Sequence, residues 1–361
     1  MNQTTNIVNQ TVTPSDLILP HCPLPRPGEI VVYYSDARPI TGKLRGHDCQ
    51  GNAIIANQFG NYDTKTFDAI RPHKPLERHE PNWYYLPSYS CIYRPTIEQQ
   101  ILLDELLSRR IPPGPKYLEL FHEIWARGFE VFLVGGTVRD VVCGKSANDI
   151  DIVTTMPLRF LRSVVTQMYN IRESGNEKRG YIRIGGTPNS GDPFIDLKVF
   201  SDSQQGTNDA TFGVDFEKDA LHRDFACNSL YYDPINKAII DPFGFGLKDA
   251  LNSELNLVCK TGVQRQLAQI FVRIIKFNIR GFKITEDTIS QMQGIVIECI
   301  PTMTKATLKQ YIITQILSKL SSNEDKIIAL SSFKKFFPTH GLDEIYRTYF
   351  QAIVTDIEGE L

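Results

Sequence analysis

Residues 131–155, VFLVGGTVRDVVCGKSANDIDIVTT, constrain the fold of this chain more than any other stretch. An apolar run of strand type ends at Gly135-Gly136, a segment with helical spacing follows, and a second apolar run carries Asp149 and Asp151. Side chains alternate along a strand, so the two aspartates share one face, about 7 Å apart, while the isoleucines beside them face a core. The stretch therefore predicts a strand, a turn, a helix and a second strand with paired acids.

This arrangement suits a triphosphate and a metal ion. Two carboxylates held side by side repel each other unless a cation lies between them, and oxygen ligands favour Mg²⁺ or Mn²⁺. Glycines at a strand-to-helix turn let backbone N–H groups approach a phosphate, and Arg139 lies one turn into the predicted helix. Asp196, in the strand-like run PFIDLKVF, supplies the further carboxylate that two-metal phosphoryl transfer uses. Solvated acids on exposed or edge strands are the alternative for both runs.

The rest of the chain divides by pattern. Residues 1–27 are polar and unpatterned, which predicts disorder. Residues 28–73 hold short strand-like runs between Asp, Gly and Asn turns, which predict a small SH3- or Tudor-like β-barrel, with an irregular β appendage as the alternative. We interpret residues 74–114 as a linker and helix, 115–258 as a head domain, and 259–361 as a helical neck and C-terminal domain, an α+β chain overall.

Helical periodicity supports this division. After Thr96 an apolar stripe of Ile97, Ile101, Leu102 and Leu106 predicts a helix with these residues against a core. Beyond the head the pattern is almost wholly helical, with predicted helices over residues 263–280, 286–298, 303–321, 323–336 and 341–357.

Charge and cysteine usage narrow the class of protein. The net charge is −2, yet residues 256–340 carry twelve Lys and Arg against five Asp and Glu, which fits either a cationic surface for a nucleic-acid backbone or solvated helix faces. The seven cysteines are scattered without C-x-x-C spacing, which indicates reduced thiols. No secretory signal and no apolar run of about 20 residues is visible, so we expect a cytoplasmic protein with no membrane partner.

The opening stretch resembles the signature of class II tRNA nucleotidyltransferases and bacterial poly(A) polymerases, in the polymerase β superfamily. The family pattern is L-V-G-G-x-V-R-D, then Gly, then D-x-D. Two further blocks follow in the family's order: DALHRDFACNSLYYDP, with departures at His222 and Cys227, and IIDPFGFGLKDAL, a structural link from head to neck with a departure at Phe245. The resemblance covers about residues 115–282 and implies a polymerase β-like head, a mixed sheet with helices, followed by an all-α neck.

The resemblance also implies a reaction and its residues. The reaction is template-independent transfer of a nucleoside monophosphate from an NTP, ATP or CTP, to the 3′-hydroxyl of an RNA, tRNA among them, with release of pyrophosphate. Catalysis and binding of Mg²⁺ or Mn²⁺ fall to Asp149, Asp151 and Asp196. Nucleotide binding falls to Gly135, Gly136, Arg139, Asp140, Arg223, Asp224, Asn228 and Arg273.

One family motif is not recognisable. The base-reading E-D-x-x-R falls on Gln266, Leu267 and Ile270, where no acid stands. Gln266 or Gln269 can still pair with a base edge, because an amide offers both a donor and an acceptor. Two alternatives stay open: nucleotide transfer to a protein selected by residues 28–73, and a non-catalytic RNA-binding scaffold, which would predict loss of the acids that are present.

Overall fold

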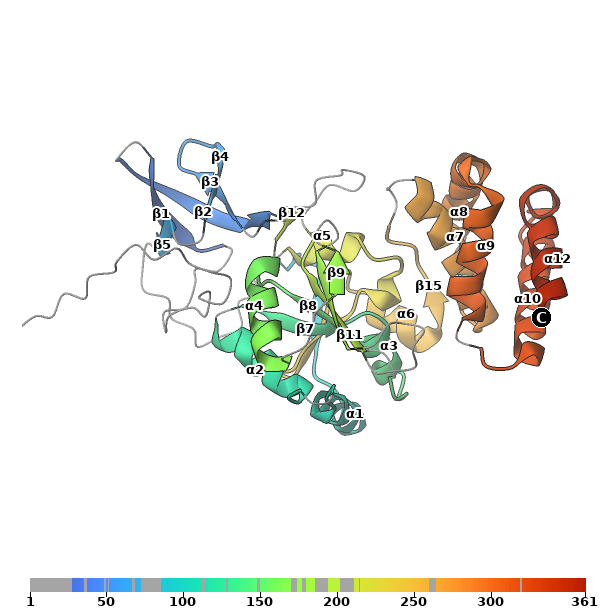
Figure 1. The fold of residues 1–361 in the computed structure, drawn as a ribbon, viewed down its shortest axis with the longest axis horizontal. Coiled ribbons are helices and arrows are strands. Elements are labelled where there is room, and N and C mark those ends of the chain that lie inside the picture. Colours follow the sequence, from blue (N-terminus) through green and yellow to red (C-terminus); the bar gives the residue numbers. More distant parts are fainter. Residues whose placement is uncertain are drawn as a thin grey trace, which may run out of the picture.

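A computed structural model describes most of the chain in three parts. They lie along its longest axis: an N-terminal sheet, a central head and a group of C-terminal helices (Figure 1). The predicted disorder of residues 1–27 and most of the predicted linker lie outside the described residues. The described ranges are 28–35, 38–48, 50, 52–66, 69–72, 86–111, 114–127, 129–147, 150–169, 174–176, 180–185, 194–201, 211–213, 215–259, 264–318 and 320–361.

The N-terminal part is an antiparallel sheet, as predicted, with strand order β4-β3-β2-β1-β5. Alternate residues such as Val31, Tyr33, Leu44 and Ile55 are buried on one face. The described pairings leave β4 and β5 as edges, and closure into an SH3- or Tudor-like barrel stays a prediction. The strands are β1 (Ile30–Ser35), β2 (Arg38–Asp48), β3 (Ala53–Asn57), β4 (Tyr62–Lys65) and β5 (Ile70–Pro72).

A sixth strand of this sheet comes from much later in the sequence. Strand β12 (Thr211–Phe212) pairs with the end of β2, where Thr211 faces Asp48. The next residue, Gly213, donates its N–H to the carbonyl of Phe200 in the head, 3.0 Å away. The N-terminal sheet is therefore joined to the head by backbone hydrogen bonds, which the sequence did not predict.

The head contains a mixed sheet, as predicted, with order β6-β14-β13-β7-β8-β11-β10-β9, in which only β8 and β11 run parallel. Its strands are β6 (Cys91–Tyr93), β7 (Val131–Val134), β8 (Ile150–Thr154), β9 (Ser174–Asn176), β10 (Tyr181–Gly185), β11 (Phe194–Val199), β13 (Tyr231–Asp233) and β14 (Ala238–Asp241). Its helices are α1 (Ile97–Ser108), α2 (Tyr117–Ala126), α3 (Gly136–Val142), α4 (Leu158–Tyr169), α5 (Phe216–Leu221), α6 (Gly246–Asn252) and a 3-10 turn (Ala226–Asn228).

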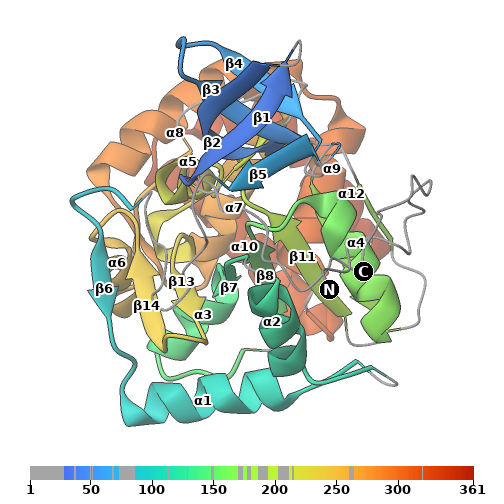
Figure 2. The same cartoon turned by 90° about the vertical axis from the view of Figure 1, so that its left-hand side faces the viewer.

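The two faces of the head sheet are covered differently. Ile150 and Ile152 of β8 belong to the main core with residues of α2 and α4, which lie over that face in Figure 2. On the opposite face Val153 joins a smaller aromatic cluster with Phe216 of α5. Because β8 alternates, this second face also carries Asp151. The prediction that the isoleucines of the D-x-D strand face a core is confirmed.

Helix α1 forms where predicted, but only part of its predicted apolar stripe is buried. Thr96 caps its first turn in a reciprocal pair of hydrogen bonds with Gln99. Ile97 and Ile101, predicted to pack inward, are 78% and 61% exposed. The side chains that pack on the head lie further along the helix, at i, i+3 and i+4 spacing: Leu103, Leu106 and Leu107. The prediction holds for Leu106, which is buried, and for Leu102, which packs partly buried against the core, and it fails for Ile97 and Ile101, because tertiary contact decides which apolar residues of the helix are covered.

The C-terminal part is all-α, as predicted, and Phe271 of its first helix packs among aromatic rings of the later helices. No helix in the described ranges is long and apolar enough to cross a bilayer. The elements are α7 (Gln264–Ile279), α8 (Glu286–Cys299), a 3-10 turn (Ile300–Thr302), α9 (Lys305–Ile312), a π-helical turn (Ile313–Leu317), α10 (Asn323–Thr339), α11 (Asp343–Ile345), a π-helical turn (Tyr346–Phe350) and α12 (Gln351–Glu360). A short parallel pair, β15 (Glu254–Leu255) and β16 (Lys283–Ile284), links head and neck.

The run IIDPFGFGLKDAL is a structural turn into α6. The Asp241 carboxylate accepts hydrogen bonds from the backbone N–H groups of Phe243, Gly244 and Leu247 at 3.0 to 3.2 Å. A Cβ at Gly246 would lie 2.5 Å from the carbonyl oxygen of Ala226, so only glycine allows this close approach.

Asp249, on α6, makes the stability of this region depend on pH. Burial, with the nearby charges of Glu254 and Asp241, raises the pKa of its carboxyl to about 6, although Asn256 donates to it at 2.9 Å. The unfolded chain therefore releases this proton near pH 4 while the folded chain keeps it up to about pH 6, and stability falls as pH rises across that window. We expect Asp249→Asn to raise the free energy of unfolding at pH 7.5 by about 1 to 3 kcal/mol and to leave it unchanged near pH 4.

Urea denaturation at both pH values measures this effect. Asp287→Asn, which removes an exposed carboxyl from the first turn of α8, is the control and should lower the free energy of unfolding at pH 7.5 by less than about 1 kcal/mol rather than raise it. An equal gain at both pH values for Asp249→Asn would contradict the titration argument.

Candidate active site

Two of the predicted metal-binding carboxylates lie side by side in the head sheet. Asp151 of β8 is the register partner of Asp196 of β11 in the parallel pair, so their side chains leave the same face from strands about 4.8 Å apart. Asp149 lies outside the described residues. Among the residues that the structure describes, no three acidic, histidine or cysteine side chains gather as a metal cluster. The sequence thus placed two acids correctly as neighbours, and the part of Asp149 stays a prediction.

The Gly-Gly turn lies directly beside this pair. Gly135 has a φ of 72°, in the left-handed region that favours glycine. A Cβ at this position would lie 3.6 Å from Oδ2 of Asp151 and 3.9 Å from Nη1 of Arg223. Thr137, one residue into α3, accepts a hydrogen bond from the backbone N–H of Asp151 at 3.2 Å. The turn, the carboxylate and Arg223 therefore meet at one place.

An arginine that the sequence analysis missed flanks the carboxylates on the other side. Arg183 of β10 is the register partner of Asp196, and its Nε and Nη2 donate to the two oxygens of Asp196, each at 2.6 Å. The hydrogen bond to Asp196 is the largest cause of a raised Arg183 pKa, to which the charge of Asp151 also contributes. The signal was present in YIRIG, where Arg183 alternates with two buried isoleucines beside the strand that carries Asp196.

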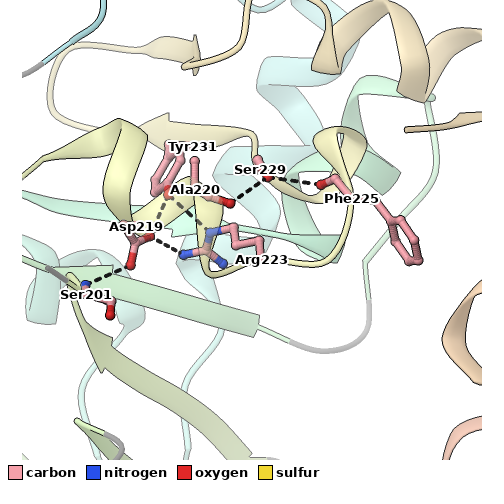
Figure 3. Close-up of polar contacts among 7 residues, drawn as sticks. All are labelled: Ser201, Asp219, Ala220, Arg223, Phe225, Ser229 and Tyr231. Atoms are coloured by element: carbon pink, nitrogen blue, oxygen red, sulfur yellow. Dashed lines mark hydrogen bonds and ion pairs between the residues drawn. The ribbon is translucent and has the colours of Figure 1, made fainter. Parts of the chain in front are cut away.

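Arg223 is held by a buried cluster on α5 and β13 (Figure 3). Its Nη2 donates to Oδ2 of Asp219 at 2.7 Å, its Nε donates to the Tyr231 hydroxyl at 3.1 Å, and the guanidinium lies over the Tyr231 ring. Asp219 also accepts from the Tyr231 hydroxyl at 2.5 Å and from the Ser201 N–H at 3.0 Å. These contacts use Nε and Nη2 and direct Nη1 toward the Gly135 turn.

Asp219 is charged in this cluster in spite of its burial. Burial alone raises the pKa of its carboxyl, but the Arg223 charge and the hydrogen bonds from Tyr231 and Ser201 outweigh burial, and the net pKa is lowered. Sequence reasoning named Arg223 but missed Asp219, although it lies four residues before Arg223, at the spacing of a helical ion pair.

A second polar chain joins the head to the neck. Arg139 donates to Oδ1 of Asn228 at 2.6 Å and to Oδ1 of Asp140 through Nε and Nη2. Asn228 in turn donates to Asp224 at 2.9 Å, and Asp224 pairs with Arg273 of α7 at 2.5 Å. The structure thus brings five predicted nucleotide-binding residues into one connected network. The guanidinium of Arg139, predicted to fork onto a phosphate, is engaged by protein groups here.

The ion pair across this junction keeps Asp224 ionised. Burial raises the pKa of its carboxyl, but the charge of Arg273, with hydrogen bonds from Asn228 and the Phe225 N–H, lowers it overall. Nε of Arg273 is buried and has no hydrogen-bond partner within the described part of the chain.

One face of α7 is turned toward these residues. Phe277 lies beneath Arg139, with the guanidinium 5.1 Å from its ring centre, and Arg273 lies one turn earlier on the same face. Gln269, a further turn earlier, is half-buried, whereas Gln266 is exposed. Of the two glutamines proposed from the sequence to read a base, Gln269 is the closer in the helix to the Arg273–Asp224 pair.

Paired acids on neighbouring strands of a mixed sheet, with a Gly-Gly turn beside them, make up the candidate site, and a helical neck adjoins the head. Residues 131–256 match the family model described as the poly A polymerase head domain. The match runs from the first residue of β7 to the residue after β15, so this segment of the chain is similar to that domain.

Relatives of known activity share only part of their length with this chain. It is 29% identical over 184 residues to a CCA-adding enzyme of Geobacillus kaustophilus, covering 49% of this chain and 43% of that enzyme. It is 28% identical over 190 residues to poly(A) polymerase I of Escherichia coli O6:H1, covering 47% and 38% respectively. The chain therefore spans less than half the length of these relatives.

Solved structures confirm the fold. A CCA-adding enzyme in complex with ATP superposes with a TM-score of 0.52 at 20% identity, over 70% of this chain and 54% of the other. A complex of a CCA-adding enzyme with CTP superposes with a TM-score of 0.51 at 21% identity, over the same shares.

Proposed function

We propose that this protein is a template-independent nucleotidyltransferase that transfers a nucleoside monophosphate from an NTP to the 3′-hydroxyl of an RNA. The observation that carries the proposal is the register pairing of Asp151 with Asp196 beside the Gly135 turn. The relatives that share the head are named CCA-adding enzyme and poly(A) polymerase I, which supports ATP or CTP as the donor and an RNA end, tRNA among them, as the acceptor.

The carboxylates are proposed to hold Mg²⁺ or Mn²⁺. Their all-oxygen donor set fits a hard divalent cation, and two acids on one face of adjacent strands need a cation between them. Asp149, two residues before Asp151, is the proposed third ligand. When bound, the metal lowers the pKa of the attacking hydroxyl and offsets charge on the phosphates.

The remaining site residues position the triphosphate. Arg223, held through Asp219 and Tyr231, presents Nη1 to the Gly135 turn, where a phosphate oxygen would lie beside Asp151. The RNA 3′-hydroxyl loses its proton to water as its oxygen forms a bond to the α-phosphorus, the bond from that phosphorus to the α–β bridging oxygen breaks, and pyrophosphate leaves. A guanidinium that is fixed before the substrate arrives stabilises the departing charge without reorganisation.

The base is proposed to meet the face of α7 that carries Gln269 and Arg273. Gln269 offers a donor and an acceptor, and Nε of Arg273 offers a further donor.

We expect Gln269→Ala to lower the ratio of kcat/KM between the best and the next-best NTP by about tenfold, because a side chain that pairs with a base edge discriminates between bases at that level. Gln266→Ala, one turn earlier and exposed, is the matched control and should leave the ratio unchanged. An equal effect of both substitutions would contradict the assignment.

The proposed reaction is tested by incubating the purified protein with each α-labelled NTP, Mg²⁺ or Mn²⁺, and a mixture of cellular RNA and protein. We expect label in a product that ribonuclease degrades, with pyrophosphate released in equal amount. Label in a product that only protease degrades would overturn the RNA acceptor in favour of a protein acceptor selected by residues 28–73. NTP binding without transfer from any nucleotide would favour an RNA-binding scaffold.

A further inference from the structure

A cation of the protein itself lies against the carboxylate pair. Arg183, Asp196 and Asp151 stand in one row across β10, β11 and β8, because Arg183 is the register partner of Asp196 and Asp196 that of Asp151. All three side chains therefore leave the same face of the sheet. Arg183 and Asp196 are 20% and 17% exposed, so water screens their pairing only in part.

We propose that Arg183 is a resident counter-cation of this site, and that it sets the divalent-cation affinity by competing with the metal ion for Asp196. The inference rests on the proposed function in one respect, namely that Asp151 and Asp196 hold the metal. It adds a residue that neither the resemblance nor the motif spacing indicates, and a regulatory property that follows from the geometry.

The geometry of the pair carries the argument. Arg183 uses two nitrogens on the two oxygens of Asp196, each at 2.6 Å, so one lone-pair site on each oxygen is already occupied. A metal ion that binds Asp196 must take the remaining lone pairs beside a positive charge, or displace the guanidinium. Both routes cost binding free energy, because a unit charge repels a dication strongly over a few ångströms in a partly buried site.

The pairing of Arg183 with Asp196 also stabilises the protein when no metal ion is bound. Without a metal ion, Asp196 and Asp151 would face each other as neighbouring negative charges, and Arg183 neutralises one of them. Removing Arg183 should therefore lower the stability of the metal-free protein and make that stability depend on a bound cation. If the pair were purely structural, removing Arg183 would lower the stability of the protein in the same way, but added metal would not restore that stability.

The test measures Mn²⁺ binding through the electron paramagnetic resonance signal of free Mn²⁺, for the wild-type chain and for Arg183→Gln. We expect the affinity for Mn²⁺ to rise roughly ten- to a hundredfold in Arg183→Gln. Lys198→Gln is the matched control: it removes one exposed positive charge two residues from Asp196 on the same face, and should change the affinity less than about twofold. Arg183→Lys, which keeps the charge but not the two-nitrogen contact, should fall between wild type and Arg183→Gln.

Thermal unfolding supplies a second readout that does not depend on activity. Added Mg²⁺ should raise the thermal unfolding midpoint of Arg183→Gln more than the midpoint of the wild type. A ligand that binds the folded state more tightly stabilises that state more. Unchanged or weaker Mn²⁺ binding in Arg183→Gln, with Arg183→Lys behaving like wild type, would overturn the inference and make Arg183 an orienting partner of Asp196. If Asp151→Asn leaves Mn²⁺ binding of the wild-type background intact, the proposed metal site itself fails, and the two failures are thereby distinguished.

Discussion

Asp151→Asn should reduce nucleotide transfer by about a thousandfold or more, on the order of 4 kcal/mol in activation free energy. The substitution keeps the size and shape of the side chain but removes the charge that faces Asp196 and the Gly135 turn. The backbone N–H of residue 151 still donates to Thr137, so the local fold should persist. The measurement is single-turnover transfer of labelled nucleotide to RNA, alongside circular dichroism and the thermal unfolding midpoint.

The control for this variant is an acid of the same size outside the site. Asp287→Asn on α8 should transfer at the wild-type rate. Transfer that survives in the double variant with asparagine at both positions 149 and 151 would show that the chemistry takes place elsewhere. A large fall in the unfolding midpoint of Asp151→Asn would instead mean that the loss is one of folding.

Asp219→Ala should lower the free energy of unfolding by about 3 to 5 kcal/mol, because it removes one partner of a buried ion pair and leaves the other charge uncompensated. Three donors lose their acceptor in this variant: Nη2 of Arg223, the Tyr231 hydroxyl and the Ser201 N–H. Urea denaturation at pH 7, followed by fluorescence, measures the loss. Nucleotide transfer should fall as well, since Arg223 loses the contact that directs it.

A substitution at a neighbouring acid shows how much of the stability loss comes from the burial of Asp219 and how much from the loss of a charge alone. Asp215 caps α5, where its carboxylate accepts from the N–H groups of Glu217 and Lys218, and Asp215→Ala should cost only about 1 kcal/mol. The double substitution Asp219→Ala with Arg223→Met should recover part of the stability lost in the single variant, because no unpaired charge remains. A cost for Asp219→Ala no larger than that for Asp215→Ala would refute the account of the cluster.

The local geometry around the acids was predictable because it follows from short-range rules. Alternation along residues 149–152 placed Ile150 and Ile152 in the core, and Gly135 is the residue that a turn with a φ of 72° requires. The neck helices lie close to their predicted ranges, since their amphipathic pattern and caps are local properties.

The features that could not be predicted are those that depend on tertiary contacts between distant segments. The pairing of Arg183 with Asp196 needs the register between β10 and β11, and neither strand alone specifies it. The reach of Arg273 to Asp224 depends on how α7 packs against the head, and the same packing decides that Gln269 rather than Gln266 is half-buried. On α1 the predicted stripe is buried only in part for the same reason, since packing on the head covers Leu106 and leaves Ile97 and Ile101 exposed.

The pairing of β12 with β2 constrains how a newly made chain can fold. On a ribosome, β1 to β5 emerge long before Thr211 and Phe212. One edge at the end of β2 is paired by β3, but the edge that takes β12 keeps unpaired backbone groups until most of the head has been synthesised. A chain released early would expose that edge to other nascent chains. Excision of the N-terminal sheet by proteolysis or by gene truncation would, for the same reason, leave the head with a segment whose partner is gone.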